Sequence, residues 1–361
     1  MRLVWGTVNG IAGERDGIQR LDVALDDGTA GLAIAYPALS GACSVGDRVL
    51  LNTTAVDLAL GTGGAHFVTA RAGEGVALED ASSGHVMKLR YSPLQRDVLA
   101  VEEAASPHAA VMAGAISLEG TPVVCCGLHS QILPVAAAIK GIDPGLRTVY
   151  VMTDGASLPL AFSDLVASMS RDGLLDETVT AGQAFGGGLE AVTLHSALLA
   201  AKHVARADVI VVALGPGITG TATPFGHGGV AQGEAVNAVA ALGGQPIAPL
   251  RISFADARVR HRGVSHHSLV ALGTVALARA LVVVPSLPSD AAAEVDVALD
   301  AARIWERHTR VDGAASPLPD TRGSAMHSMG RTPTDDPAFF AAAAAAGVLA
   351  ANHARGIGSV R

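Results

Sequence analysis

The strongest constraint on the fold is a series of short, wholly apolar runs, each followed by a loop rich in glycine or polar residues. The clearest run is Val209–Leu214, VIVVAL, which leads into the loop GPGITGTATPFGHGG and then into a helix-like pattern. The other predicted core strands are residues 121–126, 146–153, 177–185, 245–252 and 281–284. Continuous Val, Ile and Leu runs that alternate with helices are typical of parallel sheets covered on both faces. The sequence therefore predicts a doubly wound, mostly parallel α/β domain of three layers.

The N-terminal part has a different pattern, in which short strands are separated by turn residues. Strands are predicted at residues 3–11, 19–25, 31–36, 48–54 and 66–70, with a hairpin turn at Asp26-Asp27-Gly28. This spacing favours a small β-barrel of the OB or SH3-like kind. Residues 71–84, rich in Gly, Ala, Ser and acidic side chains, indicate a linker. Since 361 residues exceed one ordinary domain, we expect a barrel over 1–88 and the α/β domain over 89–361.

The remaining segments predict helices and one long loop. Residues 94–104, after Ser92-Pro93, and residues 290–307 have helical patterns, and Asp336-Pro337 is a favourable start for a last helix. Residues 309–336 predict a long polar loop, which in a compact domain usually closes over a site or wraps a neighbour. Arg331 in this loop is either a lid residue or, more simply, a surface arginine.

Composition excludes several classes of protein. The longest apolar run, residues 338–351, is shorter than the roughly 20 residues that cross a bilayer, and the N-terminus lacks a signal-peptide pattern. We therefore expect a soluble cytoplasmic protein without a membrane partner. A net charge of −8 and 3% aromatic residues argue against nucleic acid as a partner. Cys125 and Cys126 are adjacent in a predicted strand, so they should face opposite sides as buried small hydrophobes, like Cys43.

The predicted sheet locates a ligand site. In open α/β sheets, ligands bind beyond the carboxyl ends of the strands, where the strand order reverses. His129 and Ser130, Asp154, Gly186–Gly188, the central loop and residues 253–267 all follow predicted strands. We expect these loops to meet at one edge, with His129 and Ser130 as ligand contacts and Asp154 as a possible catalytic group. Ser130 lacks the G-x-S-x-G context of a hydrolase nucleophile.

The central loop carries groups suited to an anion. Its predicted ligand contacts are Gly215, Gly217, Thr219, Thr221 and Thr223, and His227 is a candidate acid or base. Glycines allow a close approach of the backbone, and the N–H groups of a following helix favour phosphate or carboxylate. The loop is neither a P-loop nor a dinucleotide fingerprint. The alternative is an ordered loop without a ligand.

A second candidate cluster follows the strand at residues 245–252. It contains the predicted anion contacts Arg258, Arg260 and Arg262 and the acid or base candidates His261, His266 and His267. Ser265 is the expected N-cap of a helix whose first turn holds His266 and His267, where a neutral imidazole is favoured. Arginine suits phosphate or carboxylate, and histidine suits proton transfer. Metal binding with Asp154 or Asp256 stays open, although H-x4-H-H matches no standard ligand spacing. A solvated basic loop is the third interpretation.

The motifs VGDRVLLN, LGTGGAHFV, MKLRYSPLQ, GLHSQ, GPGITGTATPFGHGG, RHRGVSHHS and SMGRTP occur together along the chain. In this combination the sequence resembles an uncharacterised bacterial family with a domain of unknown function, DUF3866-like. The resemblance covers essentially the whole chain and implies no activity, cofactor or catalytic residue.

The sequence thus predicts a protein that binds an anionic small molecule, phosphorylated or carboxylated, at strand-end loops. It leaves open whether the protein is an enzyme using histidine acid/base chemistry or a non-catalytic ligand-sensing or scaffold protein. Cofactors, a metal and homo-oligomer formation are equally open.

Overall fold

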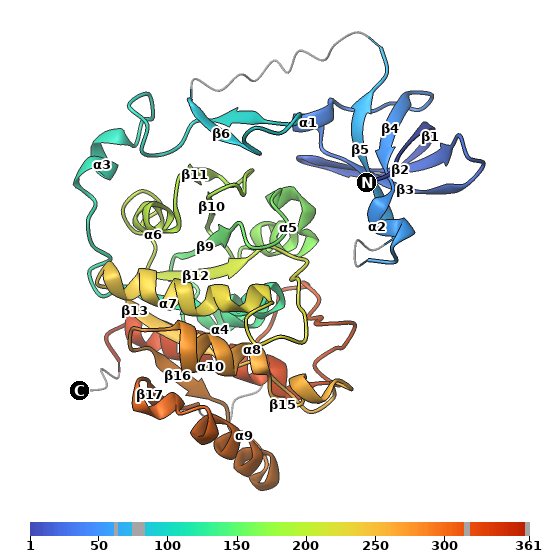
Figure 1. Ribbon diagram of the computed structural model, residues 1–361. Helices are drawn as coiled ribbons and strands as arrows, with labels where there is room; N and C mark the ends of the chain where they lie inside the picture. Colours follow the sequence, from blue (N-terminus) through green and yellow to red (C-terminus); the bar gives the residue numbers. More distant parts are fainter. Residues whose placement is uncertain (61–63, 74–83, 314–317, 358–361) are drawn as a thin grey trace. The chain divides into compact units, whose positions relative to one another are not determined.

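The computed structural model describes residues 1–60, 64–73, 84–313 and 318–357 and divides into two compact units, Met1–Leu99 and Ala100–Arg361 (Figure 1). Most of the predicted linker, part of the glycine loop at 60–64 and part of the loop at 309–336 lie outside the described residues. The first unit extends past the predicted boundary near residue 88, because a hairpin of β6 (Val86–Lys88) and β7 (Arg96–Val98) belongs to it.

The first unit is a closed five-stranded barrel. Its strands are β1 (Leu3–Arg15), β2 (Ile18–Leu25), β3 (Ala30–Ala35), β4 (Arg48–Asn52) and β5 (Ala65–Arg71), with short helices α1 (Pro37–Ser40) and α2 (Thr54–Asp57). The strand order is β1-β2-β3-β5-β4, and β4 closes onto β1. β5 runs parallel to β3, whereas the other pairs are antiparallel. This arrangement is OB-like and confirms the predicted small barrel.

The helix predicted at residues 94–104 does not form. Residues 96–98 are a strand, and residues 101–108 are turns. The two glutamates that seemed to belong to the helix cap backbone groups instead: Glu103 accepts from the Ala100 N–H at 2.7 Å, and Glu102 accepts from the Val192 N–H at 2.9 Å. Tertiary contacts therefore override a weak helical pattern.

The second unit is built on an eight-stranded sheet. Its strands are β8 (Pro122–Cys125), β9 (Thr148–Thr153), β10 (Glu177–Ala181), β11 (Leu189–Ala191), β12 (Val209–Leu214), β13 (Gln245–Pro249), β16 (Leu281–Val284) and β17 (Thr309–Asp312). The order is β11-β10-β9-β12-β8-β13-β16-β17, and every neighbouring pair is parallel. The predicted doubly wound α/β fold is confirmed.

Two edge strands were not predicted. β17 lies in the segment expected to be a polar loop, and β11 follows a glycine turn. The Thr-Arg-Val-Asp sequence of β17 is only half buried, because an edge strand pairs on one side and needs no continuous apolar run.

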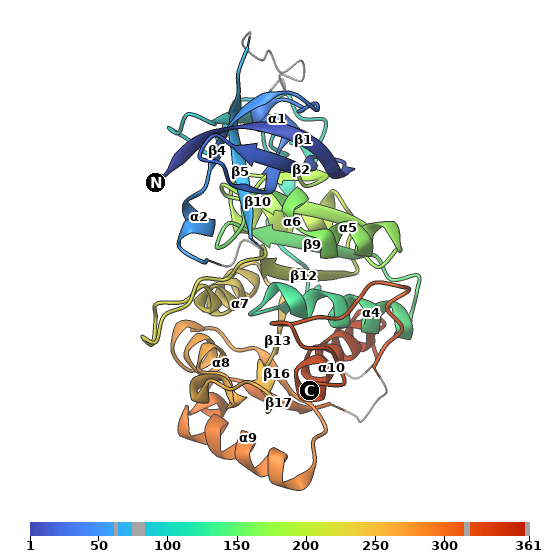
Figure 2. The same ribbon diagram turned by 90° about the vertical axis from the view of Figure 1, so that its right-hand side faces the viewer.

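Helices cover both faces of the sheet (Figure 2). α4 (Ile132–Ile142), α5 (Asp164–Arg171) and most of α10 (Pro337–Ala354) pack into one core layer. α6 (Leu194–His203), α7 (Ala231–Ala241) and α9 (Ser289–Ala301) pack into the other, where α3 (Ala109–Gly114) also contacts α6. Cys125 and Cys126 fall in opposite layers, and all three cysteines are buried and free, as predicted.

The order of the strands reverses around β8. The chain leaves β8 through α4 to reach β9, β10 and β11, and it later returns to insert β12 between β9 and β8. α4 after β8 and α7 after β12 lie on opposite faces of the sheet. Neighbouring strands thus send their loops in opposite directions, which opens a crevice at their carboxyl ends.

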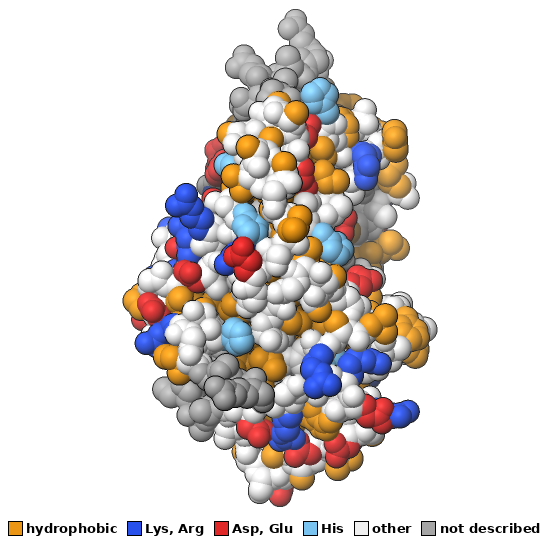
Figure 3. Space-filling view, turned by 90° about the vertical axis from the view of Figure 1, so that its left-hand side faces the viewer, with side chains coloured by type: hydrophobic (Ala, Val, Ile, Leu, Met, Phe, Trp, Pro, Cys, Tyr) orange, Lys and Arg blue, Asp and Glu red, His pale blue; other side chains and the backbone are white. Residues whose placement is uncertain are grey.

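The outer surface shows no comparable organisation of charge on the face drawn in Figure 3. Acidic and basic side chains are interspersed there. α10 is long and apolar enough to span a bilayer, but it packs against α4 and the sheet, and 56% of it is buried. It is placed as a core helix, as the sequence predicts.

The close packing of α10 on α4 gives a stability test. A Cβ at Gly347 would lie within the contact distance of the Val135 carbonyl oxygen and 2.9 Å from the Ala138 Cβ. Gly347→Ala should therefore destabilise the fold by about 1–3 kcal/mol, since overpacking outweighs the gain in helix propensity. Gly141→Ala on α4, where nothing lies within 4 Å, is the matched control and should stabilise by up to about 1 kcal/mol. Denaturant unfolding measures both, and equal effects would contradict the packing argument.

Candidate functional site

The loops after β8, β12 and β13 form two neighbouring groups along the carboxyl edge of the sheet. One surrounds a cavity beside His129 and Ser130, and the other is a cluster of four histidines. The loop 215–229 contributes to both, with Gly215–Ile218 lining the cavity and His227 joining the cluster.

Two buried glutamines brace the strand ends behind these loops. Gln131 accepts from the N–H groups of Gly127 and Leu128 and donates to the Leu250 carbonyl at 3.2 Å. Gln232 donates to the carbonyls of Cys125 and Pro249, at 2.9 and 2.8 Å. They join the end of β8 to that of β13. Sequence reasoning missed both, although a glutamine just inside an apolar helix after a strand is a detectable signal.

The central loop is largely a self-contained hairpin. The Thr221 N–H donates to the Gly226 carbonyl at 2.8 Å, and the Gly228 N–H donates to the Thr219 carbonyl at 2.9 Å. The hydroxyls of Thr221 and Thr223 lie 2.8 Å apart, and Thr221 also donates to Gly226. Among the predicted contacts, Thr219, Thr221, Thr223 and Gly217 are exposed, whereas Gly215 is buried against the Ser157 carbonyl. The threonine hydroxyls of the tip thus bond within the loop.

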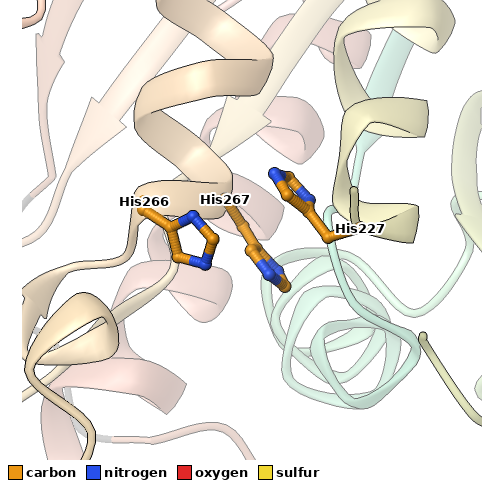
Figure 4. Close-up of side chains that lie close together, drawn as sticks. All are labelled: His227, His266 and His267. Carbon is orange, nitrogen blue, oxygen red and sulfur yellow. The ribbon is translucent and has the colours of Figure 1, made fainter. Parts of the chain in front are cut away.

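This hairpin returns His227 to the sheet edge, where it meets three other histidines. The His227 ring stacks on His267 with a centroid distance of 3.8 Å and an interplanar angle of 6°, and it lies 5.0 Å from His266 (Figure 4). His261 lies 5.0 Å from His266 and 4.9 Å from His267. Gly229 permits the stack, because a Cβ there would lie 3.0 Å from Nδ1 of His227. The structure therefore assembles all four predicted acid or base histidines.

Short local elements hold His261, His266 and His267. β14 (Ile252–Ser253) and β15 (Gly263–Val264) form a small antiparallel ribbon, and α8 (His266–Val270) follows and continues into a π-helix (Ala271–Val275). Ser265 is the predicted N-cap, since its Oγ accepts from the His267 N–H. The same Oγ lies 2.7 Å from Nδ1 of His261.

The nitrogens of the cluster differ from those of an ordinary core histidine. His308, which is 4% exposed, accepts from the Ala280 N–H through Nδ1 and bonds the Leu272 carbonyl through Nε2. His227, which is 5% exposed, has no hydrogen-bond partner at either nitrogen among the described residues. Nε2 of His266 is also buried without such a partner in that part of the chain. Unpartnered buried nitrogens cost about 1–3 kcal/mol each, so they mark a site rather than packing.

All four rings are neutral at pH 7. Burial lowers the pKa of His267 to about 2 and that of His261 to about 3, and Arg251 adds to both shifts. Burial also lowers the pKa of His227 and of His266. The charges of His227 and then Arg260 further lower the pKa of His266. Neutral imidazoles can accept a proton or ligate a metal.

A network of arginines and aspartates adjoins the cluster. Arg258 binds both carboxylate oxygens of Asp256, at 2.9 and 2.8 Å, and Arg331 donates to Asp256 at 3.3 Å and to Asp336 at 3.1 Å. Arg251 donates to Nδ1 of His267 at 3.1 Å and lies 3.8 Å from Asp256. The Arg258 guanidinium holds the pKa of the Asp256 carboxyl well below its usual range. Three cations face two carboxylates, which leaves one net positive charge.

Arg331 is therefore not a simple surface arginine. Its side chain is 21% exposed and pairs with two buried carboxylates. The tight turn at Ser328–Arg331, with positive φ at Met329 and Gly330, positions it. The roles of Arg251 and Asp336 were also missed, since only the fold brings them to Asp256.

The predicted arginine group is only partly assembled. Arg258 is committed to Asp256, whereas Arg260 and Arg262 are exposed. Arg260 acts on the His266 ring, but no described contact joins Arg262 to the cluster. Asp154 accepts from the Gln183 N–H at 3.0 Å and makes no hydrogen bond or ion pair with these histidines within the described ranges.

The cavity at the other group measures about 230 Å³ and is lined mostly by apolar atoms around Leu128, Leu165, Ile218 and Met329. Nε2 of His129 bonds the Ser163 hydroxyl at 2.7 Å, and Nδ1 lies 3.2 Å from both the Tyr150 hydroxyl and the Leu214 carbonyl. Ser130 pairs with Ser328 at 3.0 Å. Both predicted contacts reach a cavity, but the ring nitrogens of His129 already have partners.

The buried histidines predict how stability depends on pH. Unfolded histidine takes up a proton near pH 6.5, whereas folded His261 does so only near pH 3, so stability is full above about pH 6.5 and falls as the pH drops. One such ring contributes a slope of up to about 1.4 kcal/mol per pH unit. His261→Gln should reduce the loss of unfolding free energy between pH 7 and pH 5, as measured by denaturant titration. His195→Gln, outside the cluster, is the control, and an unaltered slope in His261→Gln would refute the assignment.

Comparison with known proteins gives one match. No curated protein and no solved structure matches the chain. A family model described as a protein of unknown function, DUF3866, matches residues 32–347, which cover most of the barrel and nearly all of the α/β unit with its histidine cluster. The chain therefore belongs to the DUF3866 family.

Proposed function

We propose that this protein binds an anionic small molecule at the histidine cluster and that the cluster exchanges protons with it. The observation that carries the proposal is His227, whose two buried nitrogens have no partner in the described part of the chain. A fold that hides an unpartnered imidazole beside three other imidazoles leaves hydrogen-bonding capacity for a ligand.

The charge of the surroundings supports an anion. The network around Asp256 retains one net positive charge, and Arg251, Asp256 and Asp336 are each no more than 5% exposed. A buried net charge is costly unless a counterion balances it. A carboxylate or phosphate group near Arg258 and Arg260 would supply that balance and accept the guanidinium N–H groups that Asp256 leaves unused.

The histidines support proton transfer. His266 is only partly buried and borders the exposed Arg260, whereas His227, His261 and His267 lie behind it. A neutral imidazole beside a bound anion can accept a proton from the ligand as a general base. In the alternative role, a non-catalytic sensor, the same site would bind the anion without turnover.

Two matched arginine variants test the anion site. In metal-free protein, inorganic phosphate should raise the thermal unfolding temperature by binding the folded state. Arg260→Gln should weaken phosphate binding roughly tenfold, about 1.4 kcal/mol, because Arg260 acts on the cluster. Arg262→Gln makes the same charge change on an exposed residue of the same segment and should bind phosphate as the unaltered chain does.

Isothermal titration calorimetry with phosphate gives the two dissociation constants directly. Equal affinity in the two variants would show that binding follows overall charge and would remove the proposed site. The absence of phosphate and citrate binding in the unaltered chain would remove it as well.

A further inference from the structure

The histidine cluster has a second property, the convergence of its ring nitrogens. One nitrogen from each of His227, His266 and His267 lies within 4.8 Å of the other two. The rings come from the end of the central loop and from the first turn of α8, and Figure 4 shows them gathered between these elements. Three imidazoles from two separate segments thus meet at one point.

The unpartnered nitrogens indicate what this point is built to hold. Both nitrogens of His227 and Nε2 of His266 are buried and lack a hydrogen bond within the described residues. A water molecule or an anion satisfies such nitrogens when they carry protons, and a cation satisfies them when they present lone pairs. Because neutral imidazole has one nitrogen of each kind, two adjoining rings can direct a lone pair to a shared cation.

The donor set selects the class of metal. Imidazole nitrogen suits zinc, copper, nickel, cobalt and iron, whereas magnesium and calcium require mainly oxygen ligands. Asp256 and Asp336 are engaged by arginines or by Ser253, so no carboxylate is offered to the group. Three histidines leave at least one coordination position open, as in zinc sites that act on substrates.

His267 needs a defined rearrangement to take part. Arg251 has only N–H donors, so Nδ1 of His267 is the acceptor of their 3.1 Å bond and the ring proton is on Nε2. Ligation through Nε2 would shift that proton to Nδ1 and release Arg251 toward Asp256, 3.8 Å away. The stacked rings of His227 and His267 would also tilt, because a metal lies in the plane of each imidazole it binds.

We propose that His227, His266 and His267 bind one divalent transition-metal ion of the zinc or cobalt class. His261 is a positioning residue, since it contacts His266 and His267 and bonds Ser265. The open coordination position adjoins Arg258 and Arg260, so the metal would polarise a bound anion or water there. The functional meaning of this metal rests on the anion site proposed above, but its binding does not.

Cobalt titration of the full chain tests the proposal. Metal-free protein in a phosphate-free buffer is titrated with Co²⁺, and the visible d–d absorption of a tetrahedral nitrogen site is followed. We expect one Co²⁺ per chain and displacement by Zn²⁺. His227→Gln and His266→Gln should each weaken Co²⁺ binding by at least about a hundredfold, the upper range for loss of a merely supporting residue.

His195→Gln, on α6, removes a histidine elsewhere and should leave Co²⁺ binding unchanged. Circular dichroism checks that each variant folds, and the half-buried His266 keeps the test decisive if His227→Gln does not fold. No stoichiometric Co²⁺ spectrum, or an equal affinity in His266→Gln, overturns the metal site. Phosphate binding by the metal-free chain is measured separately, so the anion site can survive that outcome or fail alone.

Discussion

The structure of the second unit depends on a parallel sheet whose central strands are buried on both faces. β8 and β12 expose no residue to solvent, so their interior positions accept only apolar side chains. Polar groups can lie only beyond the strand ends, where the backbone also needs partners. Gln131 and Gln232 meet that need and bring the ends of β8 and β13 together. The reversal of strand order around β8 then gathers loops from distant parts of the chain.

Interior charge is the second organising feature of this edge. Asp256, Asp336 and Arg251 are buried, and an isolated charge in such a place would cost several kcal/mol. Arg258 and Arg331 reduce that cost by pairing, and Ser253 adds a hydrogen bond to Asp336 at 2.6 Å. The network also ties residues 251–258 to the turn at 328–331. It therefore holds the segment that carries His261, His266 and His267 against the C-terminal part of the chain.

Much of this organisation was predictable where local chemistry is unambiguous. The runs VIVVAL and PVVC form buried strands, and Ser265 caps the helix that starts at His266. Weak patterns failed. Residues 94–104 contain acidic groups that cap other segments, and the half-exposed edge strand β17 carries no apolar run. Arg331 looked like a surface residue because its two carboxylate partners are 75 and 5 positions away in the sequence.

By itself, the sequence determined the fold class, the OB-like barrel, the family and the segments that carry reactive side chains, because hydrophobic periodicity and turn residues act locally. It also singled out the four histidines as candidates. Only the tertiary structure decided which of them meet, which nitrogens stay without partners and which arginines are already paired. Those properties depend on contacts between residues far apart in the chain, such as His227 on His267 and Arg331 on Asp256. No local pattern encodes such distances, because strand order, and not sequence spacing, sets them.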